Sequence, residues 1–407
     1  MGKYRIICSK CGHVVKDEPA YKCPACGGIL EFKYDVPKQF GERTAGAHGV
    51  FKYLDVLPVS GDMPVTLGEG GTPLVESVRL AEEFGLDRLF FKLEFVNPTG
   101  SFKDRGMAVL FTKAAELGMK KAVVASSGNA AASAAAYAAR SGVELVAVVP
   151  ENTPEGKTVQ METHGGKVLK VPGLFGNSYT LCKGLAEKNG WFNLTTTFLN
   201  PYAREGYKTA SYEIFEQLGH ATPDIVVVPT SDGPLLASVY EAFDELVEHG
   251  LSKKIPKLVS VQAFNCDPIN ESWRTGMPCE KTTKKWVETI ASGIDDNLDG
   301  YEEDGDHAVD LIRKSGGTAI SLTEEEVRDS VLELARDGVY AEPAGAVSAM
   351  ALRKLREGGF MKEDDIVVCV VTGSGLKNPL KIERRAIPVV STVDEAVVAV
   401  RRWDDGS

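Results

Sequence analysis

The chain has 407 residues, 43% hydrophobic and 25% charged, which excludes an intrinsically disordered or fibrous protein. Its 46 lysine and arginine residues against 57 aspartate and glutamate residues give a net charge of −11, which disfavours nonspecific binding to nucleic acid or to an anionic membrane. No apolar run is long enough to span a bilayer or to form a signal peptide. We therefore expect a cytoplasmic protein with neither a nucleic-acid nor a membrane partner.

Four of the eight cysteines form two Cys-x-x-Cys pairs near the N-terminus, Cys8 with Cys11 and Cys23 with Cys26. A glycine follows each pair, and such pairs can place four thiolates tetrahedrally around Zn²⁺. We predict a structural zinc ribbon over residues 1–34, a closed site with no open position for catalysis. Two buried disulfides are the alternative, which an intracellular location disfavours.

Beyond a connector over residues 35–66, short apolar runs alternate with helical patterns. Strands are predicted at the apolar runs Leu89–Leu93, Ala122–Ala125, Leu145–Val149, Val168–Val171, Ile225–Val228, Leu258–Val261 and Ile366–Val371. Because these runs are continuously apolar, both faces of each strand should be buried, as in a parallel sheet covered by helices. The sequence therefore predicts a doubly wound α/β fold.

The segment Asn97-Pro-Thr-Gly-Ser-Phe-Lys-Asp-Arg-Gly106 places a lysine at a helix start. Ser101 and Asp104 have capping-box spacing, so Lys103 is predicted in the first helical turn. The positive helix end and Arg105 should disfavour its ammonium form, and a lysine easily held neutral suits Schiff-base chemistry. A solvated surface lysine is the alternative.

Two further loops follow predicted strands. Ser126, Ser127 and Gly128 lie where backbone N–H groups at a helix N-terminus can bind a carboxylate, although a tightly packed helix without ligand would show the same spacing. Thr372 opens a Gly-rich turn that could also be an ordinary turn after a strand.

Three C-terminal segments complete the pattern. The acidic stretch Asp295–Asp306 is predicted to be a solvated loop. Overlapping capping boxes, Ser321 with Glu324 and Thr323 with Glu326, predict a helix that Gly338 ends. Residues 381–407 are predicted to be a short strand and an amphipathic helix capped by Ser391.

The decapeptide from Asn97 to Gly106 strongly resembles the cofactor-lysine motif of the fold-type II pyridoxal-phosphate enzymes, and most closely that of the threonine synthase family. The resemblance extends from about Leu67 to Pro379 and includes Gly68–Leu74, Ser126–Gly142, Asn200–Thr209, Tyr340–Ala346 and Thr372–Pro379. Some members also begin with a comparable cysteine ribbon. The resemblance implies a tryptophan synthase β-like catalytic region over residues 67–380 with two doubly wound α/β lobes. The mobile small lobe, about residues 100–205, would be inserted in the larger one.

The resemblance also implies roles for single residues. Lys103 would be the catalytic residue that forms a Schiff base with pyridoxal 5′-phosphate, and Asn129 would contact the 3′-oxygen of this cofactor. The Thr372 hydroxyl would hydrogen-bond the pyridine nitrogen without fully protonating the ring, which suits elimination and replacement rather than transamination. The substrate α-carboxylate would be held by Ser126, Ser127 and Gly128.

The cofactor-phosphate loop maps to residues 225–236 but departs from the family pattern. Only one glycine remains in the loop core, Pro234 has no N–H group, and Asp232 brings a like charge near the phosphate. The predicted phosphate ligands are the hydroxyls of Thr230 and Ser231 with the N–H groups of Gly233, Leu235 and Leu236.

The family's substrate-phosphate residues, an Asn-Ser pair and an arginine, correspond here to Thr197, Phe198 and Ala203. Arg204 and Lys208 are the remaining cations predicted to bind substrate. Without the arginine, O-phospho-L-homoserine should be a poor substrate even though its conversion to L-threonine is the family's default reaction.

The resemblance predicts an elimination or replacement at the β or γ carbon of a small-molecule amino acid, by a homodimer. One alternative is an ammonia-lyase resembling threonine or serine dehydratase, or a β-replacement enzyme acting on a serine-type substrate. A zinc-ribbon binding or sensor protein is an alternative from another class, which the few basic residues of the ribbon disfavour.

Overall fold

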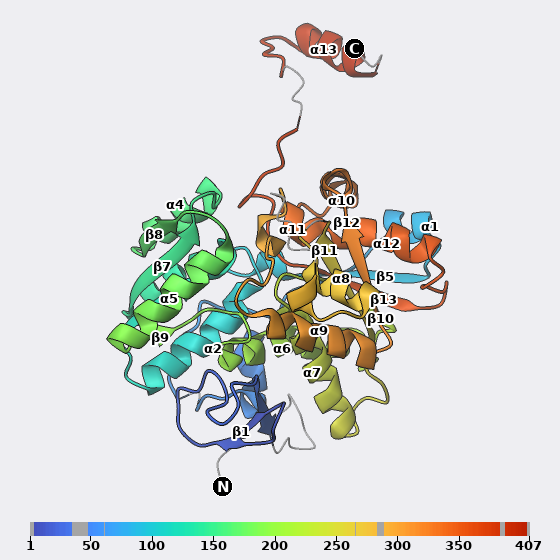
Figure 1. The fold of residues 1–407 in the computed structure, drawn as a ribbon. Coiled ribbons are helices and arrows are strands. Elements are labelled where there is room, and N and C mark those ends of the chain that lie inside the picture. The colour runs from blue at the N-terminus through green and yellow to red at the C-terminus, as the bar shows by residue number, and fades with distance from the viewer. Residues whose placement is uncertain are drawn as a thin grey trace.

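The described residues form three sheets (Figure 1). The computed structural model describes residues 4–34, 48–60, 62–264, 266–282, 289–382 and 387–404. Residues 35–47 of the predicted connector lie outside these ranges, and the rest of it includes the 3-10 helix η1 (Gly49–Val56). Over the described ranges, no helix is both long and apolar enough to cross a membrane.

The largest sheet has six strands in the order β12-β11-β10-β13-β5-β4. The strands are β4 (Leu74–Glu76), β5 (Arg88–Leu93), β10 (Ile225–Pro229), β11 (Lys257–Ala263), β12 (Thr318–Leu322) and β13 (Ile366–Val371). All neighbours pair in parallel except β4, which is antiparallel to β5. Along β10, Ile225 and Val227 belong to one apolar core and Val226 and Val228 to the other, so both faces are buried.

Helices cover both faces of this sheet (Figure 1). α7 and α9 pack against β11, and α12 packs against β10 and β13. The helices of this region are α1 (Arg79–Phe84), α6 (Pro201–Gln217), α7 (Pro234–Glu248), α8 (Pro268–Thr275), α9 (Glu302–Lys314), α10 (Glu324–Arg336), α11 (Pro343–Ala346) and α12 (Ser348–Glu357). The 3-10 turns are η2 (Glu94–Val96), η3 (Cys279–Lys281) and η4 (Ser292–Ile294).

The second sheet is all parallel and has four strands in the order β8-β7-β6-β9. Its strands are β6 (Lys121–Ala125), β7 (Glu144–Pro150), β8 (Lys167–Val171) and β9 (Phe192–Asn193). The accompanying helices are α2 (Lys103–Glu116), α3 (Asn129–Ser141), α4 (Glu155–Thr163) and α5 (Phe175–Asn189). α3 and α5 pack on β6 and β7, and the alanines of α3 allow this close approach.

The N-terminal sheet is antiparallel, in the order β2-β1-β3. It comprises β1 (Tyr4–Cys8), β2 (Val14–Val15) and β3 (Leu30–Tyr34). The Tyr34 hydroxyl donates to the Glu205 carboxylate at 2.7 Å, which attaches β3 to α6. This sheet is therefore docked on the larger body rather than separate from it.

Every strand predicted from a continuous apolar run is present, which confirms the parallel α/β architecture. β12 was not predicted because most of it is only half-buried, so it carries no continuous apolar run. The acidic stretch Asp295–Asp306 is not a solvated loop. Its residues Asp296 and Asp304 are buried, and α9 begins within it.

The C-terminal predictions are partly confirmed. α10 has the capping box of Thr323 with Glu326, whereas the Ser321 hydroxyl donates to Asp267 at 2.6 Å instead of capping the helix. Helix α13 (Val393–Asp404) is present, but residues 387–392 form no strand. Thr392 rather than Ser391 accepts the hydrogen bond from the Glu395 amide at 3.2 Å.

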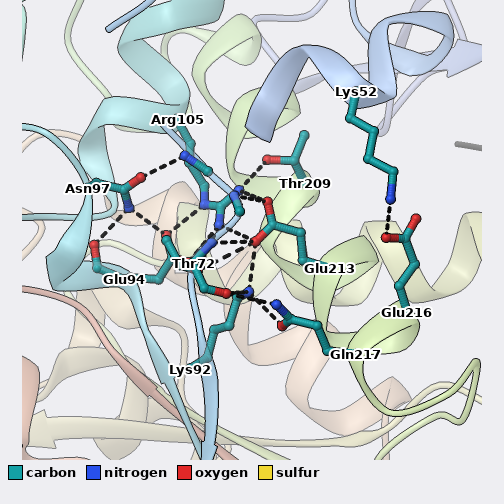
Figure 2. Close-up of polar contacts among 12 residues, drawn as sticks. Lys52, Thr72, Lys92, Glu94, Asn97, Arg105, Thr209, Glu213, Glu216 and Gln217 are labelled. Atoms are coloured by element: carbon teal, nitrogen blue, oxygen red, sulfur yellow. Dashed lines mark hydrogen bonds and ion pairs between the residues drawn. The ribbon is translucent and has the colours of Figure 1, made fainter. Parts of the chain in front are cut away.

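A buried charge network connects β5, α2 and α6 (Figure 2). The Arg105 guanidinium is fully buried and pairs with Glu94 at 2.6 Å and with Glu213 at 2.7 Å. Lys92 also pairs with Glu213 at 2.7 Å. Burial favours the neutral carboxyl, but Arg105 and Lys92 outweigh it and hold the pKa of Glu213 well below its usual range.

We predict that Glu213→Gln lowers the free energy of unfolding by about 3–5 kcal/mol at neutral pH, because it leaves buried cations without their partner. The control Glu216→Gln removes a carboxylate whose side chain is 25% exposed and pairs with Lys52, so it should change stability by less than about 1 kcal/mol. Since the pKa of Glu213 is lower in the folded state, its stabilisation is present above the unfolded pKa of about 4.3 and lost as pH falls. Denaturant titrations at pH 7 and pH 4 measure both effects. Equal losses in the two variants would contradict the prediction.

Candidate active site

A pocket lies at the carboxyl ends of strands from both parallel sheets, as is usual in open α/β folds. β6 ends at Ala125, β10 at Pro229 and β13 at Val371, and the residues that follow each strand line the pocket. The lining includes Lys103, Ser126, Ser127, Asn129, Thr196, Thr197, Thr230, Ser231, Asp232, Gly233, Leu235, Asp295, Asp296, Glu342 and Thr372. At Ser127, this inner pocket adjoins a wider cavity of about 590 Å³.

Lys103 is the first residue of α2, as predicted, but the predicted capping box is wrong. The Asp104 carboxylate accepts from the Thr99 N–H group at 2.7 Å and from the Thr99 hydroxyl at 2.6 Å, so it stabilises the preceding loop. The Phe102 N–H group donates to the Thr372 carbonyl at 3.0 Å. This bond joins the loop that precedes Lys103 to the turn that follows β13.

Lys103 is half-buried, and its amine lies in a partly acidic environment. Its Nζ donates to the Thr196 hydroxyl at 2.9 Å. Burial lowers the pKa of Lys103 to about 8, although Asp232 and Asp296 favour the ammonium form. The predicted direction is therefore confirmed, but its cause is burial, because Arg105 points away into the network of Figure 2.

Lys377 is a second lysine with a lowered pKa, but its surroundings differ from those of Lys103. Burial also lowers the pKa of Lys377 to about 8. Its Nζ, however, donates to the Thr99 carbonyl at 2.5 Å and to the Gln160 side chain at 2.7 Å. Two acceptors thus hold Lys377 in the wall of the wider cavity, whereas Lys103 lines the inner pocket.

The loop after β6 forms the start of α3. The Ser126 hydroxyl accepts from the N–H groups of Gly128 at 2.9 Å and Ala131 at 3.1 Å, so it caps the helix. Gly128 has φ +137°, and a Cβ there would overlap the Lys157 side chain. Because its N–H group already donates to the Ser126 hydroxyl, Gly128 has no N–H group left for a ligand. Ser127, by contrast, lines both cavities.

Asn129 is fixed by one end of its amide. Its Nδ2 donates to the Glu342 carboxylate, which in turn pairs with the buried Lys157 at 3.0 Å. Within the described part of the chain, the buried Asn129 Oδ1 has no hydrogen-bond partner. An unpaired buried acceptor at a pocket wall is unusual and indicates a place for a donor from a ligand.

The loop after β10 uses its polar groups differently from the prediction. The Thr230 hydroxyl donates to the Val228 carbonyl at 2.9 Å, and the Ser231 hydroxyl faces Asp296 at 3.4 Å. Gly233, with φ +104°, is the N-cap of α7, so the Leu235 N–H group lies in the first helical turn. The loop therefore presents a helix N-terminus to the pocket, with fewer free hydroxyls than expected.

Arg204 and Lys208 do not reach this pocket, so their predicted place in it is wrong. Arg204 donates to the Leu30 carbonyl at 2.7 Å and pairs with Glu241 at 3.3 Å. Lys208 pairs with Glu205 at 2.6 Å and Glu245 at 2.7 Å. The register of α6 directs both cations toward the ribbon and α7, away from the loops that line the pocket.

Four polar lining residues were missed by sequence reasoning: Thr196, Asp295, Asp296 and Glu342. Glu342 lies in a segment that carried the family resemblance, so its acidic side chain was a usable signal. Asp296 was hidden in a stretch that reads as a solvated loop, and burial raises its pKa to about 6.

The N-terminal cysteines converge at the edge of the ribbon. Their sulfurs lie within 4.8 Å of one another, and no disulfide joins them. Burial disfavours the Cys8 thiolate, but the N–H groups of Cys11 and Lys10 outweigh it and lower the pKa of Cys8 to about 7. This arrangement is able to hold a metal ion.

Residues 65–373 match the profile of the family described as pyridoxal-phosphate dependent enzyme. The chain belongs to this family. Threonine synthase of Methanosarcina acetivorans is 38% identical over 382 residues, covering 92% of this chain and 93% of the relative. Threonine synthase of Methanocaldococcus jannaschii is 39% identical over 381 residues, which cover 91% of this chain and 92% of that relative. These relatives place the chain in the threonine synthase family and confirm the resemblance read from its motifs.

Solved structures support the fold alone. Maize serine racemase has a TM-score of 0.63 at 22% identity, covering 82% of this chain and 93% of that one. An L-serine ammonia-lyase from Rhizomucor miehei has a TM-score of 0.61 at 22% identity, covering 74% and 93%. The fold is therefore that of the fold-type II pyridoxal-phosphate enzymes.

Proposed function

We propose that this threonine synthase-like enzyme uses Lys103 to hold pyridoxal phosphate and to move a proton at the substrate α-carbon. The chain eliminates a leaving group from the β or γ carbon of an amino acid and adds water or another nucleophile. The observation that carries the proposal is the lowered pKa of Lys103, the only lysine or arginine among the described residues that line the inner pocket. A neutral amine there serves both as nucleophile and as base.

The pocket fits the cofactor. The unpaired Asn129 Oδ1 would accept from the cofactor's 3′-oxygen when that oxygen is protonated, Thr372 offers a hydroxyl after β13, and the N-terminus of α7 offers N–H groups for an anion. When bound, pyridoxal phosphate supplies an electron sink for negative charge at the α-carbon. The residues of the chain orient this chemistry, since Glu342 fixes the Asn129 amide and Thr196 fixes the Lys103 amine.

The N-terminus of α3 supports binding of the α-carboxylate. Ser127 lines both cavities, and helix N-termini favour anions. Gly128 contributes by allowing the turn rather than through its N–H group, which is bonded to Ser126.

We predict that Lys103→Ala abolishes both turnover and the visible absorbance of covalently held cofactor, because the same amine attaches the cofactor and moves the proton. The matched control Lys377→Ala removes the other lysine of low pKa and should keep covalent attachment. Absorbance spectra of both purified variants measure this. An absorbance band retained in Lys103→Ala and lost in Lys377→Ala would assign the role to Lys377.

The inner pocket is poorly suited to a phosphorylated substrate. Thr197, Phe198 and Ala203 are buried at the positions where the family pattern has its phosphate ligands. Among the described residues lining this pocket, Lys103 is the only lysine or arginine, while Asp232 and Asp296 are acidic. Arg204 is buried and bonded elsewhere, so it is not available to replace the missing cation.

We predict that kcat/KM for O-phosphohomoserine is about tenfold to a hundredfold below that for the best non-phosphorylated amino acid among serine and threonine. Loss of one charge-assisted contact costs about 1.5–3 kcal/mol, which corresponds to this range. Steady-state kinetics on the three compounds test it. Efficient threonine formation that Arg204→Ala abolishes would show that Arg204 moves into the pocket and that this reading is wrong.

We also propose that Cys8, Cys11, Cys23 and Cys26 hold a structural zinc ion. The Sγ atoms of Cys11 and Cys23 are 3.7 Å apart and those of Cys8 and Cys26 are 3.5 Å apart. Four sulfurs at about 2.3 Å from a tetrahedral Zn²⁺ lie about 3.8 Å from one another, so little movement is required.

Cys23→Ser should therefore weaken zinc binding and loosen the ribbon, because metal binding contributes to folding at such sites. The control Cys182→Ser changes a buried single cysteine and should keep one zinc per chain. Metal analysis of the purified proteins gives the answer. One zinc per chain in a variant with serine at all four ribbon positions would refute the site.

A further inference from the structure

A third cavity, of about 590 Å³, lies where the ribbon meets α7 and α9. It shares no lining residue with the two cavities at the candidate active site. More carboxylates than ammonium groups line it, so its wall attracts cations. The carboxylates are Glu31, Glu241, Asp244, Glu245, Glu303, Asp306 and Asp310, and the ammonium groups are Lys10, Lys33, Lys208 and Lys314.

Three of the lining side chains converge from three different elements. Glu31 lies on β3, Glu241 on α7 and His307 on α9, and one ligand atom of each lies within 4.8 Å of those of the other two. One imidazole nitrogen and two carboxylates form a donor set that suits divalent transition-metal ions. Ligand atoms about 2.1 Å from a tetrahedral ion lie about 3.4 Å apart, so rotation of the two glutamate side chains has to close the cluster by roughly 1 Å.

His307 gives an independent indication of a ligand. Its Nε2 atom is buried and has no hydrogen-bond partner among the described residues. The Phe198 ring meets the imidazole edge to face, with ring centroids 5.1 Å apart, and offers it no hydrogen bond. A buried ring nitrogen without a partner is unusual in a folded protein, and a metal ion is a common partner of imidazole nitrogen.

Of the two carboxylates, only Glu241 forms an ion pair within the described part of the chain, with Arg204 at 3.3 Å. The two lysines whose charges act on Glu31 are Lys33 and Lys208, and each of them pairs with another glutamate. Two carboxylates this close repel each other, and a divalent cation between them removes that repulsion. Arg204 opposes the cation, so one arginine competes with two carboxylates and an imidazole.

We propose that Glu31, Glu241 and His307 bind a divalent transition-metal ion that ties β3 of the ribbon to α7 and α9. Two carboxylate oxygens and one imidazole nitrogen hold the ion, and water in the cavity fills its other positions. The inference depends neither on pyridoxal phosphate nor on zinc at the four cysteines, because no ligand belongs to either site. Since the ion contacts three elements only when they are folded together, its binding stabilises the docked ribbon.

The test titrates Mn²⁺ into the full purified chain. Mn²⁺ suits carboxylate ligands, whereas thiolates select other metals, so the ribbon cysteines compete poorly for it. The EPR signal of free Mn²⁺ gives the affinity and the number of ions bound, and pulsed EPR detects nitrogen bonded to the ion. We expect one Mn²⁺ per chain with one nitrogen ligand, and a Tm that rises with Mn²⁺ concentration.

His307→Gln and Glu31→Gln each remove one ligand and should weaken Mn²⁺ binding by at least about tenfold. His307→Gln should also remove the nitrogen signal, and neither variant should show the rise in Tm. Glu241 is left unchanged because its loss would leave the buried Arg204 unpaired. The matched control Asp244→Asn removes a carboxylate that lines the same cavity outside the cluster, and should change the affinity by less than about threefold.

Four outcomes would overturn the inference. They are no saturable binding of Mn²⁺, a bound ion without a nitrogen ligand, unchanged affinity in both ligand variants, and equal weakening in the ligand variants and Asp244→Asn. The last would show general attraction to an acidic cavity rather than a site. The nitrogen signal is measured on the unsubstituted protein, and Glu31→Gln tests the cluster from another element if His307→Gln fails to fold.

Discussion

The paired burial of Arg105 between Glu94 and Glu213 is the interaction on which the rest of the site depends. It fixes the first turn of α2 against η2 and α6 in the buried interior, where a lone charge would be strongly destabilising (Figure 2). Lys103 lies two residues earlier on the same helix start. The network therefore helps to fix the position of Lys103, and it holds the Arg105 guanidinium away from the Lys103 amine.

The chemistry of the pocket follows from burial more than from nearby positive charge. Removal from water lowers the pKa of Lys103 and raises that of Asp296, and both changes bring groups toward neutrality. A pocket of neutral donors and acceptors suits a cofactor whose ring stores electron density. For a second, substrate phosphate the pocket offers little, since Lys103 is the only lysine or arginine among its described lining residues and Thr197, Phe198 and Ala203 stand at the family's substrate-phosphate positions.

The parallel strands could be predicted because the central strands are apolar on both faces. Such a strand must be buried on both sides, as it is in a parallel sheet covered by helices. The position of Lys103 at a helix start could also be predicted from its motif. The partners of Asp104 and Arg204 could not, because each side chain has several acceptors or donors within reach and tertiary contacts select among them. Asp296 shows the same limit, since a hydrophilic stretch gives no sign that a polar residue will be buried.

The central claim is that Lys103 carries the cofactor, and the most direct measurement is borohydride reduction of the holoenzyme followed by peptide mapping. Reduction fixes the pyridoxyl group to the lysine that holds it. The account predicts one pyridoxyl group per chain, on the peptide that contains Lys103. A label on Lys377 or Lys157, two buried lysines near the pocket, would contradict it.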